Sequence, residues 1–218
     1  MRFFPVFTWM VLLSAFSLAQ DKVPQQLVPS EYASSEAERT GAGVFKLLPR
    51  GTYENPKGTY GDKDNPIGIR QGGSYYSFTT GSHSYNKIPQ IGLEQGHMMV
   101  GFYGANYGFI ADLGSISLVD ISTATPASAA VLGYSPPAAY KECYEEASRS
   151  RAIDLGGTKF VRSIPVVEGH TYVLRAISFD EADKLVALQV VLINKDGSIE
   201  IIWRSLKDLA VTRMIRPK

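Results

Sequence analysis

The segment that decides the fold is LVALQVVLINKDGSIEIIWR, residues 185–204. Its first half, Leu185 to Ile193, is apolar on both alternating faces, which is typical of a central strand covered on both sides. Its second half, Ser198 to Arg204, places apolar side chains on alternate positions. The intervening Asn194-Lys195-Asp196-Gly197 has the composition of a tight turn, with Gly197 available for positive φ. The segment therefore predicts an antiparallel hairpin with one central strand.

The same alternation extends toward the N-terminus. Thr171 to Ser178 predicts a strand before the hairpin, and Val44 to Leu48 predicts the first strand of the domain. From Ser74 onward, short alternating runs are separated by glycines. Residues 101–109 interleave aromatic residues with glycines, which permit close backbone approach within a sheet. We therefore expect a mainly β fold, an antiparallel β-sandwich or open barrel with one inserted α-helix.

The inserted helix is predicted at Ala138 to Arg151, ending before Gly156-Gly157. Good helix formers fill this segment, and one apolar face has the i, i+3, i+4, i+7 spacing. Residues 123–137 are predicted to be an irregular connection, and Leu206 to Val211 a helical turn. The predicted apolar face consists of Tyr140, Cys143, Tyr144 and Ala147.

The first nineteen residues have the features of a secretory signal peptide. Arg2 gives a positive start, Val11-Leu12-Leu13 lies in an apolar run, and Ser17-Leu18-Ala19 matches a small-x-small cleavage site. No later segment has the roughly 18 consecutive apolar residues of a membrane span, so we expect a periplasmic or secreted protein. The expected parts are a signal peptide at 1–19, a flexible leader at 20–42, one β-rich domain at 43–212 and a basic tail at 213–218.

Composition excludes some partners. The chain has 22 Lys and Arg against 21 Asp and Glu, and Arg2 lies in the predicted signal peptide, so the exported part is neutral. Because nucleic-acid surfaces need clustered basic side chains, no nucleic-acid partner is expected. Cys143 is the one cysteine, so no intramolecular disulfide can form, and we expect its thiol to be buried. No asparagine begins an Asn-x-Ser/Thr acceptor, which favours a bacterial protein.

Catalytic and cofactor motifs are not recognisable. The sequence has neither a Gly-x-Ser-x-Gly elbow nor a Gly-x4-Gly-Lys-Ser/Thr phosphate loop, so no cofactor is expected. The histidines have no His-x-His or His-x3-His pairing, and we predict no metal site from them. Two acidic loops are candidate calcium contacts, although solvated turn carboxylates are the commoner interpretation. The histidines are His83, His97 and His170, and the loops contain Asp62 with Asp64, and Asp180 with Glu181 and Asp183.

Tyrosines on the glycine-rich strands are the candidate ligand-binding residues. Tyr75, Tyr85, Tyr103 and Tyr107 fall opposite or beside the expected core positions. Exposed tyrosine rings stack on sugar faces or on a protein partner at a low cost in side-chain entropy. The alternative interpretation is that the rings cover the second face of a sandwich.

Several of these segments together resemble a group of uncharacterised exported bacterial proteins, over about residues 40–205. The resemblance implies a bacterial, exported, single-module protein, and it transfers no activity and no catalytic residue. The segments that carry it are Gly73–Phe78, His83–Tyr85, Ile91–Gly96, Gly101–Phe102, Gly108–Phe109 and Gly169–Arg175.

Three functional interpretations follow. The first is a non-catalytic module of the bacterial envelope or exterior that binds a glycan, peptide or protein. The second is a secreted or periplasmic hydrolase of envelope or extracellular polymer, which requires titratable side chains to converge in a pocket. The third is a purely structural role, for which an exposed apolar patch would be the sign. The residues that the hydrolase would need to bring together are His83, His97, Asp112, Cys143 and His170.

Overall fold

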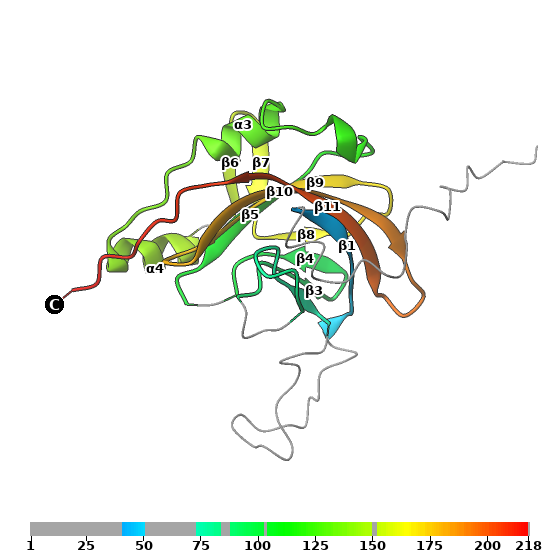
Figure 1. Ribbon diagram of the computed structural model, residues 1–218, viewed down its shortest axis with the longest axis horizontal. Helices are drawn as coiled ribbons and strands as arrows, with labels where there is room; N and C mark the ends of the chain where they lie inside the picture. The colour runs from blue at the N-terminus through cyan, green and yellow to red at the C-terminus, as the bar shows by residue number, and fades with distance from the viewer. Residues whose placement is uncertain (1–40, 51–72, 84–87, 103, 150–151, 218) are drawn as a thin grey trace, which may run out of the picture. The chain divides into compact units, whose positions relative to one another are not determined.

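The computed structural model describes residues 41–50, 73–83, 88–102, 104–149 and 152–217, which form a mainly β fold with two antiparallel sheets (Figure 1). The larger sheet has the strand order β1-β11-β10-β9-β5-β7-β6, and the smaller has β2-β3-β4-β8. The elements are β1 (Ala42–Leu47), β2 (Tyr75–Tyr76), β3 (Ile91–Glu94), β4 (His97–Met99), β5 (Tyr107–Asp112), the 3-10 helix η3 (Leu118–Asp120), α3 (Pro126–Leu132), α4 (Tyr140–Arg149), β6 (Ala152–Leu155), β7 (Thr158–Val161), β8 (Ser163–Pro165), β9 (Thr171–Ser178), β10 (Ala182–Ile193) and β11 (Ile199–Asp208).

The predicted hairpin is confirmed as β10 and β11. β10 pairs with β9 on one side and with β11 on the other, as its two apolar faces indicated. At the turn, the Asn194 N–H donates to the Ser198 carbonyl at 2.8 Å, and Gly197 has a φ of 79°. The inward-facing residues of β11, Ile199, Ile201 and Trp203, are all buried.

Both faces of the larger sheet are buried. One face packs against the smaller sheet and the other against the helices, and Figure 1 shows α3 and the smaller sheet on opposite sides of it. All eight residues of β9 are buried, because alternate side chains enter the two cores. Tyr172 and Leu174 face the smaller sheet, whereas Val173 and Ile177 face the helices.

The two sheets are joined at both sides. On one side the chain passes from β7 in the larger sheet to β8 in the smaller sheet through Arg162, whose Nε donates to the Val100 carbonyl at 3.1 Å. On the other side the Leu48 N–H, just after β1, donates to the Gly73 carbonyl, just before β2, at 2.9 Å. The β7–β8 connection and the Leu48–Gly73 hydrogen bond therefore join the two sheets on opposite sides of the core that lies between them.

The helical side differs from expectation in three places. Residues 123–137 contain α3, which begins with proline and continues in good helix formers, PASAAVL, so the prediction of an irregular connection was wrong. The predicted helical turn at Leu206 to Val211 was also wrong, since β11 continues to Asp208 opposite Lys184. Finally, α4 ends at Arg149, and Gly156-Gly157 instead form the turn between β6 and β7.

A buried ion pair ties α3 to the sheet. Arg175 of β9 is 2% exposed and faces the helical side. Its Nε and Nη2 donate to the two carboxylate oxygens of Asp183 in β10, at 2.9 and 2.7 Å. Its Nη1 donates to the Val131 and Tyr134 carbonyls at 2.8 and 2.6 Å. The guanidinium therefore binds carbonyls at and just beyond the C-terminal end of α3, where a helix has few N–H partners to offer.

A second polar chain reaches α4. The Tyr107 hydroxyl of β5 donates to the Tyr134 hydroxyl at 2.7 Å, and Tyr134 in turn donates to Glu146 of α4 at 2.9 Å. Burial raises the pKa of both hydroxyls well above the usual tyrosine range, so both stay protonated. These two hydrogen bonds connect β5, the loop that contains Tyr134, and α4. Because both hydroxyls stay protonated, the direction of each hydrogen bond is fixed.

Candidate functional site

The predicted tyrosine platform on the strands is not exposed where the structure describes it. Tyr75 packs edge-on against Phe102, with ring centroids 5.1 Å apart, and is 8% exposed. Tyr107 is 1% exposed. Neither ring offers a free face for stacking, so both residues match the alternative of rings that cover a sheet face. Tyr85 and Tyr103 lie outside the described residues.

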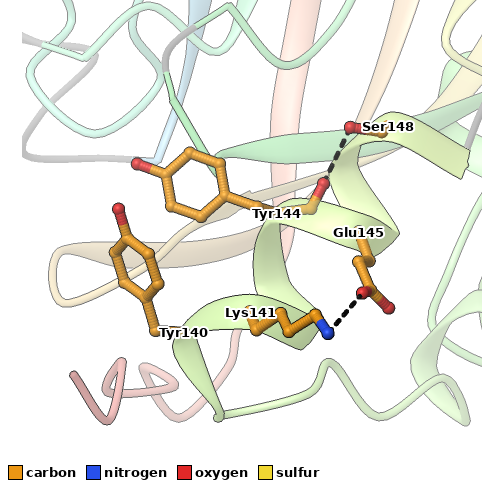
Figure 2. Close-up of a pocket in the computed structure, with 5 residues that line it drawn as sticks. All are labelled: Tyr140, Lys141, Tyr144, Glu145 and Ser148. Atoms are coloured by element: carbon orange, nitrogen blue, oxygen red, sulfur yellow. Dashed lines mark hydrogen bonds and ion pairs between the residues drawn. The ribbon is translucent and has the colours of Figure 1, made fainter. Parts of the chain in front are cut away.

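An exposed aromatic pair occurs instead on α4. Tyr140 and Tyr144 are 39% and 40% exposed, and their ring centroids lie 4.8 Å apart with the planes tilted by 47°. Figure 2 shows the two rings projecting side by side from the helix. They line an open depression of about 430 Å³ together with Lys141, Glu145 and Ser148. We call these five residues the α4 depression.

The opposite face of α4 anchors the helix in the core. Cys143 is fully buried, as expected, and Ala147 is 6% exposed. The Cys143 thiol donates to the Pro137 carbonyl at 3.4 Å, and burial raises its pKa, so it stays a neutral thiol. Helix α4 is therefore amphipathic, but with a narrower buried face than its periodicity indicates.

Both ends of α4 are also held. At the N-terminal end, Ile215 of the predicted basic tail pairs with the chain before the helix, and the Tyr140 N–H donates to its carbonyl at 3.0 Å. At the C-terminal end, Arg162 Nη1 donates to the Ala147 carbonyl at 3.4 Å. A cation at this position also complements the helix dipole. The aromatic pair is thus mounted on a fixed element.

Two ion pairs lie in or near the α4 depression. Lys141 and Glu145 form an i,i+4 ion pair at 3.8 Å, drawn in Figure 2. Arg216, whose charge acts on the Tyr144 hydroxyl, forms an ion pair with Asp180 at 3.6 Å. A hydrogen bond with Tyr140 raises the pKa of Tyr144. The depression therefore offers two aromatic rings beside one cation and one anion.

The residues required for hydrolysis mostly do not converge. Only Asp112 and His170 meet: His170 Nδ1 lies 2.9 and 3.0 Å from the two carboxylate oxygens. Cys143 lies in the helical-side core, His97 bonds to the Gln95 carbonyl, and His83 packs near Phe45 and Tyr76.

The Asp112–His170 pair is well oriented. The Gly114 N–H donates to Asp112 Oδ1 at 2.7 Å and holds the carboxylate, which in turn accepts from His170 Nδ1. Both side chains are about one quarter exposed, at 28% and 27%. A carboxylate in this position fixes the tautomer and the direction of an imidazole ring, as in hydrolytic and metal-binding sites.

Within the described ranges, no group of three or more His, Cys, Asp or Glu side chains could hold a metal ion. The acidic loop at 180–183 is engaged elsewhere: Asp183 binds Arg175, and Asp180 accepts from the Met214 N–H at 2.9 Å. Burial, followed by the charge of Asp180, raises the pKa of Glu181. Asp62 and Asp64 lie outside the described residues.

The burial of His83 predicts that the stability of the protein depends on pH. Its Nδ1 lies 2.8 Å from the Tyr75 carbonyl, which can only accept, so Nδ1 carries the hydrogen. Burial lowers the pKa of His83 below 6.5, so the unfolded chain takes up a proton at a higher pH than the folded chain. The free energy of unfolding should therefore fall as the pH drops from about 7 through 6.5, by at most ~1.4 kcal/mol per pH unit for one proton.

Urea unfolding of the wild type and His83→Asn across this pH range checks the prediction. Asparagine keeps a donor near the position of Nδ1 but does not titrate. The stability difference between the two proteins should shrink as the pH falls. A difference that stays constant from pH 7 to 5 would contradict the assignment of His83 as a buried neutral group.

Sequence reasoning placed Tyr140 and Tyr144 on the core side of the helix. The buried face of α4 is narrower than expected. Glu146 contacts the neighbouring Tyr134, whereas Tyr144 is 40% exposed. One sequence signal could have indicated that the two tyrosines are exposed. Tyr140 and Tyr144 are four residues apart, and the charged residues Lys141 and Glu145 directly follow them with the same spacing. A helix surface with this pattern carries two aromatic rings beside an ion pair.

These features define a class: a mainly β domain of two antiparallel sheets with a helical cover on one side. No family model, curated protein or solved structure matches this chain. None of the helices among the described residues is long and apolar enough to cross a membrane. The α4 depression and the Asp112–His170 pair are the two candidate functional features of the described residues.

Proposed function

We propose that this protein is an exported, non-catalytic binding module of the bacterial envelope or exterior, and that the α4 depression receives its glycan, peptide or protein ligand. The observation that carries the proposal is the pair of exposed, mutually contacting rings of Tyr140 and Tyr144. Soluble domains bury most of their aromatic area in the core, and exposed aromatic clusters mark binding sites. The predicted signal peptide and neutral charge support export without a nucleic-acid partner.

Pre-organisation supports the same proposal. Helix α4 is held by Cys143 in the core, by Glu146 through Tyr134, and by Ile215 and Arg162 at its ends. A ligand that stacks on Tyr140 and Tyr144 does not have to order the helix first. The entropy cost of binding is then confined to a few side chains and to the ligand itself.

The first test is a thermal-shift screen against peptidoglycan fragments, polysaccharide oligomers, peptides, divalent metals and a chelator. A ligand at ~100 times its Kd stabilises the folded state by roughly 2.7 kcal/mol, which moves the Tm by several degrees. We expect such a shift with one ligand class, and we expect Tyr144→Ala to reduce it by about half or more, as a roughly tenfold loss of affinity requires. The Tm of the free variant should stay close to that of the wild type, because the Tyr144 ring is 40% exposed.

Val119→Ala is the matched control. Val119 is 77% exposed but belongs to η3, outside the α4 depression, so its loss should leave the ligand-induced shift unchanged. If Tyr144→Ala keeps the full shift, the ligand binds elsewhere and the α4 depression loses its role. If metal produces the shift and the chelator reverses it, the proposal of a non-catalytic aromatic site gives way to a metal-dependent one.

The alternative is a hydrolase of envelope or extracellular polymer, and the Asp112–His170 pair is the observation in its favour. An imidazole oriented by a carboxylate can take a proton from water as the water attacks an ester or amide carbonyl. Hydrolysis of p-nitrophenyl acetate distinguishes the two functions. Turnover that His170→Gln removes, without loss of folding, would favour the hydrolase, whereas equal background rates would favour the binding module.

A further inference from the structure

The size, ring geometry and charge of the α4 depression together select one ligand chemistry. Resting on the proposed function above, we infer that the depression binds an uncharged pyranose chain, with a sugar ring stacked on Tyr140 and Tyr144. A charged polysaccharide and a proline-rich peptide are the competing occupants.

The depression is small. All five lining residues come from α4, which has ten residues and is therefore about 15 Å long. A stable interface with a folded protein covers roughly 800 Å² on each partner and involves ~20–30 residues. Five side chains on one helix fit a few units of a linear chain better than a folded surface.

The ring geometry suits a pyranose. The two rings are tilted by 47° with centroids 4.8 Å apart, and each is itself a six-membered ring with an apolar face. The C–H face of a pyranose packs on such a surface through apolar contact. Its equatorial hydroxyls then point outward, where the hydroxyls of Tyr140 and Tyr144 can donate to them or accept from them.

The charges favour an uncharged ligand. The ammonium of Lys141 and the carboxylate of Glu145 lie 3.8 Å apart and cancel at a distance, as do Arg216 and Asp180 at 3.6 Å. Each of these two pairs sums to zero charge, so neither pair by itself steers a charged ligand to the depression. At hydrogen-bond range, however, Lys141 supplies donors and Glu145 supplies acceptors, a combination that matches sugar hydroxyls.

Titration calorimetry of the purified full-length chain tests the inference with five probes. Cellohexaose, xylohexaose and chitohexaose are neutral, hexagalacturonate is anionic, and hexaproline is a peptide. We expect at least one neutral oligosaccharide to bind, with an affinity that changes less than about twofold between roughly 0.05 and 0.5 M NaCl. Hexagalacturonate and hexaproline should show no measurable heat.

Variants then locate the site. Tyr144→Ala and Tyr140→Ala should each lower the affinity for the bound oligosaccharide roughly tenfold or more, as expected for a central aromatic contact. Tyr144→Phe, which keeps the ring and loses only the hydroxyl, should weaken binding less than Tyr144→Ala does. Val119→Ala, which lies outside the α4 depression, should leave the affinity unchanged. Circular dichroism of each variant establishes that it is folded.

The outcomes separate the inference from the proposed function. Tyr144-dependent binding of hexagalacturonate or hexaproline, without binding of a neutral sugar, overturns the inference and leaves the binding module standing. Neutral-sugar binding that Tyr144→Ala does not weaken overturns the inferred site. If none of the five probes binds, the inference fails, and the broader thermal-shift screen decides the proposed function.

Discussion

Asp183→Ala is expected to lower the free energy of unfolding by about 3–5 kcal/mol. The Asp183 carboxylate accepts two hydrogen bonds from Arg175, and both side chains are 2% exposed. Removing the carboxylate leaves a guanidinium buried without its counter-charge, and that uncompensated charge is the source of the cost. Against a typical domain stability of ~5–15 kcal/mol, the loss is a large fraction of the total. Urea unfolding followed by circular dichroism measures it.

A neighbouring exposed ion pair supplies the control. Lys184 lies next to Asp183 in the sequence and pairs with Asp208 at 2.6 Å, but the Asp208 side chain is 69% exposed. Because water solvates that carboxylate, Asp208→Ala should cost less than about 1 kcal/mol. Equal losses for Asp183→Ala and Asp208→Ala would contradict the claim that burial, rather than pairing itself, makes the Arg175–Asp183 contact important.

The same ion pair has a local consequence for the helical cover. Since Arg175 also donates to the Val131 and Tyr134 carbonyls, Asp183→Ala removes the partner that aims the guanidinium at α3. Hydrogen exchange of α3 should therefore accelerate more than that of β11, whose ladder does not involve this side chain. Uniform acceleration across both elements would indicate global destabilisation without loosening of the cover.

The sheet was predictable because its signals are local. The two-faced apolar run of β10, the Asn194–Gly197 turn and the alternation in β11 each determine backbone shape within about ten residues. Residues 171–178 were predicted as a strand and form β9 with those bounds. In contrast, nothing local in β9 indicates that Arg175 is buried, because its partner Asp183 and the carbonyls of α3 are brought there by tertiary structure.

The helical cover and the candidate site were less predictable for the same reason. Apolar periodicity predicts which side chains share one face of the helix. How much of that face is buried depends on how α4 packs against the sheet, which is set by tertiary structure. The buried arc includes Cys143 and Ala147 and stops short of Tyr140 and Tyr144. Conversely, Tyr107 alternates like an outward residue, yet the helices cover that face of the sheet. Tyr75 and Tyr107, which were candidate ligand-binding residues, are buried, whereas Tyr140 and Tyr144, which were predicted on the apolar face of the helix, are exposed.

The glycines between residues 101 and 109 were expected to permit close backbone approach, and the structure confirms this for Gly101 and Gly108. A Cβ added at Gly108 would lie 2.5 Å from the Arg175 carbonyl oxygen on the neighbouring strand β9. At Gly101, which has a φ of 77°, a Cβ would lie 2.6 Å from the Cα of Tyr107. Both distances are to backbone atoms, which cannot move aside as the end of a flexible side chain can. Glycine is therefore required at these positions by space.

Gly108→Ala should consequently lower the free energy of unfolding by about 1–3 kcal/mol, toward the upper end of what overpacking costs. The added methyl group must push β5 and β9 apart where Gly108 pairs with Ala176, close to the buried guanidinium of Arg175. Urea unfolding measures the loss, and a reduced m-value would show that the folded state itself has loosened.

Gly133→Ala is the matched control, with the opposite expected sign. Gly133 ends α3 with a φ of −71°, a right-handed conformation that alanine adopts without strain, and its nearest neighbour to an added Cβ lies 3.5 Å away. Alanine there restricts the unfolded chain and should raise stability by about 0.4–1 kcal/mol. If Gly108→Ala were instead as well tolerated as Gly133→Ala, the two strands would be able to separate locally without disturbing Arg175. The close approach of β5 and β9 would then contribute little to holding the buried ion pair beneath α3.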